Sequence, residues 1–253
     1  MCNSTQHLIG YAINYGPEGP NDLWKIDFTS HRAHLIKSGF PYAEDAGLAI
    51  NSKGELYGLS ESYQLVSINK RTGDHSVVGD IDVRGNGHGA DFIGDVMVGA
   101  IATYNDNIAK FFTLNTATAA RTDFMDLPGF TVVGSMAIVD PTTIYFHAVA
   151  DSSTSAALYV VDVPTTSVTK ISDTSSRFRV MDFGIDGNLY GLGVSTSPGL
   201  NGVYRLDPFS GTETLLFDLP EIGSSGGWQA LAMDKGTTKR SLLCCLLSCF
   251  RRS

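Results

Sequence analysis

Cysteine is nearly absent from the body of this 253-residue chain. Cys2 stands alone near the start, and Cys244, Cys245 and Cys249 are crowded into the last ten residues. This distribution excludes a disulfide framework or a paired-cysteine zinc site in the long region between them. It is typical of a reducing compartment, so we expect a cytoplasmic location.

Charge is also scarce, and positive charge most of all. Charged residues make up only 17% of the chain, the formal net charge is -8, and no basic run occurs inside the repeats. Binding to nucleic-acid phosphates needs a positive footprint, so we expect no nucleic-acid partner. The first residues lack both a basic start and an apolar run, and no secretory signal is expected.

The third absence is a convincing long helical pattern. Hydrophobic residues account for 43% of the sequence, and there are 27 glycines. This composition fits many short strands joined by turns better than charged amphipathic helices. The sequence therefore predicts an all-β fold.

A repeated turn organises the chain. An Asp or Asn ends an apolar strand and a Ser or Thr follows three residues later, in the pairs Asp27/Ser30, Asn69/Thr72, Asn115/Thr118, Asp162/Thr165 and Asp207/Ser210. The short Asp or Asn side chain accepts hydrogen bonds from backbone N–H groups two or three residues on, which closes a hairpin turn. The intervals of 42, 46, 47 and 45 residues are typical of propeller blades.

Strand patterns around these turns resemble β-propeller repeats of the "LYxxD, then TG" type, as in Leu189-Tyr190 followed by Asp207 and Gly211. The resemblance indicates no specific family. It implies a five-bladed β-propeller of four-stranded blades over residues 1–238. The segment from Leu8 to Ile13 matches a second strand and Trp228 to Asp234 matches a first strand, so we expect the two ends of the chain to close one blade together.

The first strand of each blade should line the central channel. Period-two alternation places mostly small residues there: Ala49, Asp91, Ala137, Gly184 and Ala232, and two residues earlier Gly47, Gly89, Ser135, Asp182 and Ala230. Asp91 and Asp182 stand out, because two carboxylates in a tight channel would repel, raise one pKa or share a cation. They could cap backbone groups or bind water, or they could bind a divalent cation or take part in catalysis.

One mouth of the channel gathers the starts of the first strands. Candidate ligand-binding residues there are Asp45, Arg179, Trp228 and Gln229. His88 lies between glycines, which makes it the best candidate for an acid or base, with an ordinary hydrogen-bonded histidine as the alternative. The loops between second and third strands should open on the same face: Tyr15 to Asp22, Tyr104 to Asn107, Asp151 to Ala156 and Ser195 to Gly202.

We expect this mouth to bind a small polar or saccharide-like ligand, or a partner. The alternative is a propeller enzyme, a hydrolase, lyase or isomerase, that uses His88, Asp91 and Asp182. A third class is a plain interaction scaffold. Corresponding mouth positions differ from blade to blade, which favours one asymmetric site over five equal ones: they are Asp45, Gly87, Val133, Val180 and Trp228.

Residues 239–253 form a separate tail, in which an apolar and cysteine-rich run lies between two basic pairs. The run is shorter than the roughly 20 residues that cross a bilayer. One interpretation is a disordered or folded-back tail. The other is peripheral membrane contact, held by acylated cysteines and by basic side chains near anionic lipid.

Overall fold

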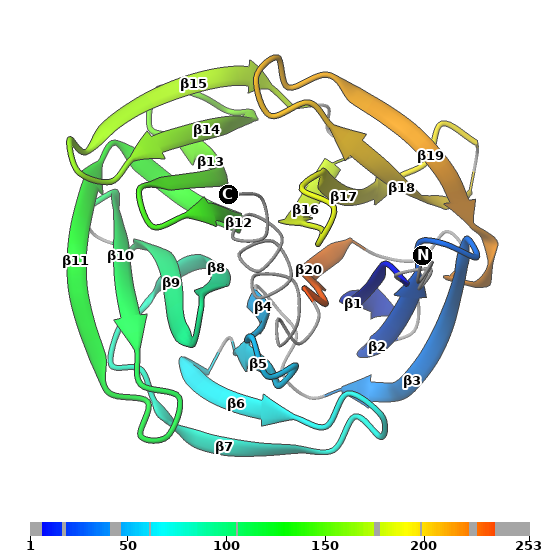
Figure 1. The fold of residues 1–253 in the computed structure, drawn as a ribbon. Helices are drawn as coiled ribbons and strands as arrows, with labels where there is room; N and C mark the ends of the chain where they lie inside the picture. Colours follow the sequence, from blue (N-terminus) through cyan, green and yellow to red (C-terminus); the bar gives the residue numbers. More distant parts are fainter. Residues whose placement is uncertain are drawn as a thin grey trace, which may run out of the picture.

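The computed structural model describes residues 7–16, 19–40, 47–60, 62–104, 106–174, 178–197, 199–222 and 227–235. Within these ranges the chain forms five four-stranded antiparallel sheets arranged as blades in a ring, which confirms the five-bladed β-propeller (Figure 1). Among the described residues the only helix is the 3-10 turn η1 (Pro220–Ile222), and no described helix could cross a membrane. Asp45 and the tail at 239–253 lie outside the described residues.

Each blade runs from an inner strand at the channel to an outer strand at the rim. Blade 1 contains β20 (Trp228–Met233), β1 (Ile9–Gly16), β2 (Gly19–Asp27) and β3 (Arg32–Phe40). Blade 2 contains β4 (Gly47–Ile50), β5 (Leu56–Leu59), β6 (Gln64–Ile68) and β7 (His75–Asp80). Blade 3 contains β8 (Gly85–Ile93), β9 (Val96–Thr103), β10 (Ile108–Leu114) and β11 (Arg121–Pro128).

The remaining two blades follow the same order. Blade 4 contains β12 (Phe130–Asp140), β13 (Thr143–Ala150), β14 (Ala156–Asp162) and β15 (Ser167–Asp173). Blade 5 contains β16 (Phe178–Phe183), β17 (Leu189–Val194), β18 (Asn201–Leu206) and β19 (Glu213–Leu219). We call the end of the ring where inner strands begin the entrance end, and the end where they finish the exit end.

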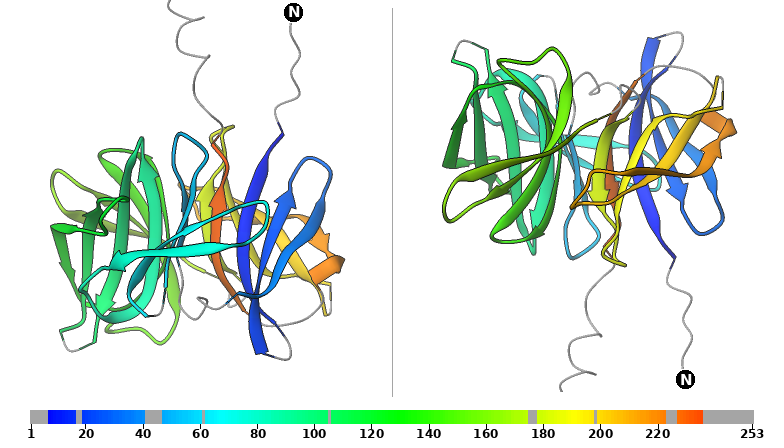
Figure 2. Two further views of the ribbon diagram at one scale, coloured as in Figure 1. Left: turned by 90° about the horizontal axis from the view of Figure 1, so that it is seen from below. Right: turned by 90° about the horizontal axis from the view of Figure 1, so that it is seen from above.

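Blade 1 joins the two ends of the chain, as expected. The last strand, β20, pairs antiparallel with the first, β1, through Gly10 opposite Met233 and Ala12 opposite Leu231. Figure 2 shows the two strands side by side through the height of the ring. This pairing closes the ring, because it covers the edge of β1 and completes the four strands of blade 1.

The repeated turns form as the sequence predicts. Asp27 Oδ1 accepts hydrogen bonds from the backbone N–H groups of Thr29 and Ser30, at 2.9 and 3.0 Å. At least one of the two equivalent bonds forms at each of the other four turns. The residue after the Ser or Thr has a positive φ in every turn, although it is glycine in only two: His31, Gly73, Ala119, Thr166 and Gly211.

Every outer strand also carries a β-bulge at the same place. One residue of the outer strand is skipped in the pairing with the third strand, and it is apolar in all five blades: Ile36, Val78, Phe124, Ile171 and Leu216. A bulge bends and twists the strand. It therefore makes the exposed rim a poor template for pairing with another chain.

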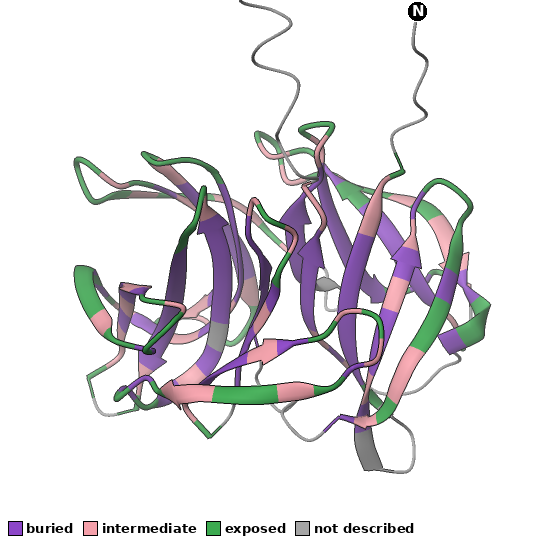
Figure 3. Cartoon of the chain, turned by 60° about the horizontal axis from the view of Figure 1, so that its bottom comes forward, coloured by how far each residue is buried: buried purple, intermediate pink, exposed green. Residues whose placement is uncertain are grey.

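Apolar side chains fill all five junctions between neighbouring blades. Between blades 3 and 4, for example, Phe111 and Phe146 meet edge to face with their ring centroids 5.6 Å apart. Burial is concentrated on the inner strands and falls toward the rim (Figure 3). The core is thus a ring of inter-blade layers around the channel.

The register of one inner strand differs from the prediction. Asp182 lies opposite Tyr190, just as Ala49 lies opposite Tyr57, so it takes the place that the sequence pattern gave to Gly184. The strand β16 ends at Phe183 because Gly184 already begins the turn, where its N–H donates to the carbonyl of Asn188. One layer of the channel therefore contains both aspartates: Ala49, Asp91, Ala137, Asp182 and Ala232.

Candidate functional site

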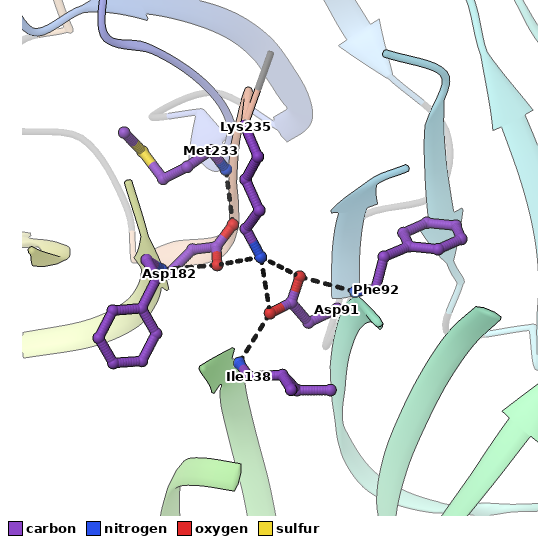
Figure 4. Close-up of polar contacts among 7 residues, drawn as sticks. Asp91, Phe92, Ile138, Asp182, Met233 and Lys235 are labelled. Carbon is purple, nitrogen blue, oxygen red and sulfur yellow. Dashed lines mark hydrogen bonds and ion pairs between the residues drawn. The ribbon is translucent and has the colours of Figure 1, made fainter. Parts of the chain in front are cut away.

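Asp91 and Asp182 meet around the ammonium group of Lys235 at the exit end of the channel (Figure 4). Lys235 Nζ lies 2.7 and 2.9 Å from the two carboxylate oxygens of Asp91 and 3.4 Å from Asp182 Oδ1. Both aspartates are buried, with exposed fractions of 1% and 3%. Lys235 is the second residue after β20, so the strand that closes the ring also brings in the positive charge.

The two carboxylates also bind backbone amides, and the pattern is the same for each. Asp91 accepts a hydrogen bond from the N–H of the next residue, Phe92, and another from Ile138 of blade 4, both at 2.7 Å. Asp182 accepts from Phe183 at 2.7 Å and from Met233 of blade 1 at 2.6 Å. Each aspartate therefore connects its own inner strand to that of the next blade.

Burial and the neighbouring charges change the pKa values of Asp182 and Lys235 in this cluster. Burial and then the Asp91 carboxylate raise the pKa of Asp182 to about 7, against the opposing effects of Lys235 and the two backbone N–H donors. Burial by itself lowers the pKa of Lys235, but the two aspartates outweigh this effect and hold that pKa above its usual value. The cluster is thus a positive ammonium held between two buried carboxyl groups, and the pKa of one of them, Asp182, is raised.

A small cavity lies in the channel next to this cluster. One layer toward the entrance end lies a cavity of about 10 Å³, lined by inner-strand residues that include Gly47, Ser135, Gln229 and Ala230. A cavity of this size holds about one water molecule. Ser135 Oγ is buried there with no hydrogen-bond partner among the described residues, which suits a bound water better than an organic ligand.

The sequence predicts that the aspartate pair would repel, raise one pKa or share a divalent cation. In the structure the pKa of Asp182 is raised, and the positive group between the two carboxylates is the ammonium of Lys235, which was not among the predicted site residues. Ca²⁺ takes six to eight oxygen ligands and Mg²⁺ takes six, whereas every carboxylate oxygen here already accepts from an amide or lies beside the ammonium. Across the described ranges, no three His, Cys, Asp or Glu side chains gather as a metal site. Metal binding by this pair stays a prediction that would require Lys235 to move away.

The remaining predicted site residues lie at the entrance end or outside the described part. His88 lies in β8 and Arg179 in β16, but only their backbone is described. Trp228 is 3% exposed and packs in the apolar layer between blades 5 and 1, so its ring is core and does not form a wall of the mouth. Gln229 is half-buried beside the small cavity.

A tyrosine pair with an arginine lies at the entrance end between blades 2 and 3. The hydroxyls of Tyr63 and Tyr104 are 2.8 Å apart, and the Arg84 guanidinium lies 5.6 Å from the Tyr63 ring centroid. Tyr104 is 55% exposed, and Arg84 is exposed as well. Burial and the bond to Tyr104 raise the pKa of Tyr63 to about 12, so its hydroxyl stays protonated. The loop that begins at Tyr104 is one of the predicted binding loops, whereas Tyr63 and Arg84 are not among the predicted site residues.

Comparison with known proteins supports the fold. No family model matches the chain, and no curated protein matches it. Similar solved structures include TolB from Acinetobacter baumannii, at 10% identity and a TM-score of 0.52, over 89% of this chain and 66% of that one. Another is the nidogen/laminin complex, at 9% identity and a TM-score of 0.55, over 90% of this chain and 98% of the matched chain. At such low identity the likeness shows a β-propeller, which is the class that the sheets define.

Proposed function

We propose that this protein is a binding module that takes a small polar or saccharide-like ligand at the entrance end, on Tyr63, Tyr104 and Arg84. The observation that carries the proposal is the hydrogen-bonded tyrosine pair next to an exposed guanidinium. Aromatic rings offer flat apolar faces to the C–H faces of a sugar, while hydroxyl and guanidinium groups bind its oxygens. The strand that follows Arg84 carries His88, which the sequence places at the same mouth.

The channel itself supports binding at its mouth better than chemistry inside it. Its carboxylates already hold Lys235 and four backbone amides, and its cavity has room for about one water. An enzyme that used Asp91 and Asp182 would first have to break these contacts. The matched nidogen/laminin structure is described as a complex, so a partner protein is the second occupant to test at the same face.

The test is a titration of the wild-type protein with a panel of neutral mono- and oligosaccharides. Binding is measured by calorimetry and by the shift of the melting temperature. A ligand that binds the native state raises the melting temperature by mass action. Tyr104→Ala should weaken binding roughly fivefold, because an aromatic contact contributes about 1 kcal/mol. Arg84→Gln should weaken it by a similar factor, because it removes hydrogen bonds from a charged donor.

Tyr15→Ala is the matched control. Tyr15 is also an exposed tyrosine at the end of a second strand, but it belongs to blade 1. The Tyr15→Ala variant should bind the same saccharides with the same affinity as the wild type. The proposal fails if no neutral saccharide shifts the melting temperature, or if Tyr15→Ala loses as much affinity as Tyr104→Ala. If no saccharide binds but the wild type captures a partner protein that Tyr104→Ala does not capture, the ligand of this site is a protein and not a saccharide.

A further inference from the structure

A second surface, at the exit end between blades 1 and 2, has the features of a separate ligand site. It is a groove with a cavity volume of about 440 Å³, lined by Tyr11, Lys25, His34, Leu35, Ile36, Lys70 and Arg71. Small-molecule sites usually occupy about 300 to 1,000 Å³. We propose that this groove, called here the blade 1–2 groove, binds a small organic anion that carries a phosphate ester or several carboxylates.

The walls of the groove come from two different blades. Tyr11 of β1 lies opposite Lys25 of β2, and Lys25 lies opposite His34 of β3, so these three side chains form one row across blade 1. Lys70 and Arg71 come from the turn between β6 and β7 of blade 2, which reaches over toward blade 1 (Figure 1). A ligand in the groove would therefore meet positive groups on both sides.

The positive charge of the groove is only partly balanced by acidic groups. Lys70 Nζ lies 2.7 Å from Asp234 Oδ2 and 5.5 Å from the centroid of the Tyr11 ring. Within the described part of the chain, no acidic side chain forms an ion pair or hydrogen bond with the side chains of Lys25 or Arg71. The formal net charge of the whole protein is -8, so three Lys and Arg side chains on one groove are a local reversal of sign.

The repeat itself does not require this charge, as the four equivalent junctions show. Each blade presents a similar row to the turn of the next blade: Tyr57 meets Thr116, and Tyr190 meets Phe28 with ring centroids 5.0 Å apart. The residues that correspond to Lys25 and His34 are Ser67 and Ser76, Thr113 and Thr122, Val160 and Thr169, and Arg205 and Thr214. The positions that correspond to Lys70 and Arg71 are uncharged in all four: Thr116 and Ala117, Val163 and Pro164, Pro208 and Phe209, and Phe28 and Thr29.

The chemistry of these groups suits a compact anion with more than one negative charge. Arg71 offers a planar fork of donors that matches phosphate or carboxylate oxygens, while lysines act as point charges. The half-buried stem of Lys25 and the ring of Tyr11 add apolar contact at the base of the groove. A neutral sugar would leave the cations without a partner, so charge rather than shape should decide what binds.

The experiment measures binding of glucose 6-phosphate and citrate to the full chain by calorimetry, with glucose as the uncharged probe. Both anions should bind, and glucose should bind at least tenfold more weakly in this groove. Raising the ionic strength from about 50 mM to about 300 mM should weaken anion binding several-fold, because salt screens exposed charges. Lys25→Gln and Arg71→Gln should each cost about tenfold in affinity.

Arg205→Gln is the matched control, because Arg205 occupies in blade 5 the position that Lys25 occupies in blade 1. The substitution also removes one positive charge, but from a junction where the positions of Lys70 and Arg71 are uncharged. It should leave anion binding unchanged. Tyr104→Ala should also leave it unchanged, which separates this site from the one at the entrance end. The inference is overturned if neither anion binds the wild type, or if Arg205→Gln loses as much affinity as Lys25→Gln.

Discussion

The carboxylate of Asp91 accepts a hydrogen bond from the backbone N–H of Ile138 at 2.7 Å and so ties blade 3 to blade 4. Asp182 repeats the contact with Met233, which ties blade 5 to the strand that closes the ring. Lys235 joins the two aspartates across the channel. Three side chains thereby connect four of the five inner strands, and the cluster has a clear structural role.

Replacing Asp91 should therefore destabilise the whole ring. Asp91→Ala leaves two buried amides without their acceptor and removes the closer partner of Lys235. We expect a loss of about 3 kcal/mol in the free energy of unfolding, measured by urea denaturation near neutral pH. Asp126→Ala is the control in the same blade, because it removes an exposed ion pair with Lys110 and should cost about 0.5 kcal/mol or less. If the two variants lose the same free energy of unfolding, Asp91 does not have this structural role.

Stability should also depend on pH through Asp182. Its pKa is about 7 in the folded protein and near 4 in the unfolded chain, so between these values the folded state binds more protons. Stability from this group is therefore greatest below pH 4 and falls as the pH rises toward 7. Urea denaturation at about pH 5 and pH 7.5 should show this loss in the wild type.

Asp182→Asn tests the assignment, because an amide resembles the protonated acid and does not titrate. The difference in stability between wild type and variant should shift in favour of the variant as the pH rises. Titrating groups far from Asp182 contribute equally to both proteins and cancel in this difference. A difference that stays constant from pH 5 to pH 7.5 would mean that Asp182 is already ionised throughout.

The sequence predicts the fold well because the repeat is encoded locally. Each Asp or Asn closes its own turn with amides two or three residues away, as at Asp27, and no distant contact is needed. The same holds for the closing blade, since the patterns of β1 and β20 are those of a second and a first strand. The predicted register of β16 is wrong because Gly184 and Ile185 continue the apolar pattern in the sequence, whereas the strand ends earlier, at a turn that begins with Gly184.

The sites are harder to predict, because their members are far apart in the sequence. Lys235 lies 144 residues from Asp91, and only the closed ring brings them together. The blade 1–2 groove combines Lys25, His34 and Lys70 from three strands or turns of two blades. A comparison of equivalent positions between blades could have found the groove. The position of Lys25 is neutral in three of the other four blades, and the position of Arg71 is neutral in all four.

A glycine at the entrance end of β8 should tolerate no side chain. Gly87 has a φ of +70°, and a Cβ there would lie 2.0 Å from the carbonyl oxygen of Val133 in the next blade. Gly87→Ala should cost about 3 kcal/mol or more in the free energy of unfolding, because a backbone atom cannot move aside. Gly94→Ala is the control: its φ is +62° but a Cβ there meets nothing within 4 Å, so about 1 kcal/mol is expected. Similar losses would show that backbone strain alone decides, without close packing of blades 3 and 4.

The closing strand gives the last prediction. A chain that ends after residue 227 loses β20, exposes the edge of β1 and removes Lys235 from between two buried aspartates. It should lose cooperative thermal unfolding, whereas a chain that ends after residue 238 keeps the strand and should melt like the full protein. A synthetic peptide of residues 227–238 should restore the transition to the shorter chain, and the same peptide with Lys235→Met should restore it less. A normal transition in the chain that ends at 227 would show that the ring does not depend on its terminal strand.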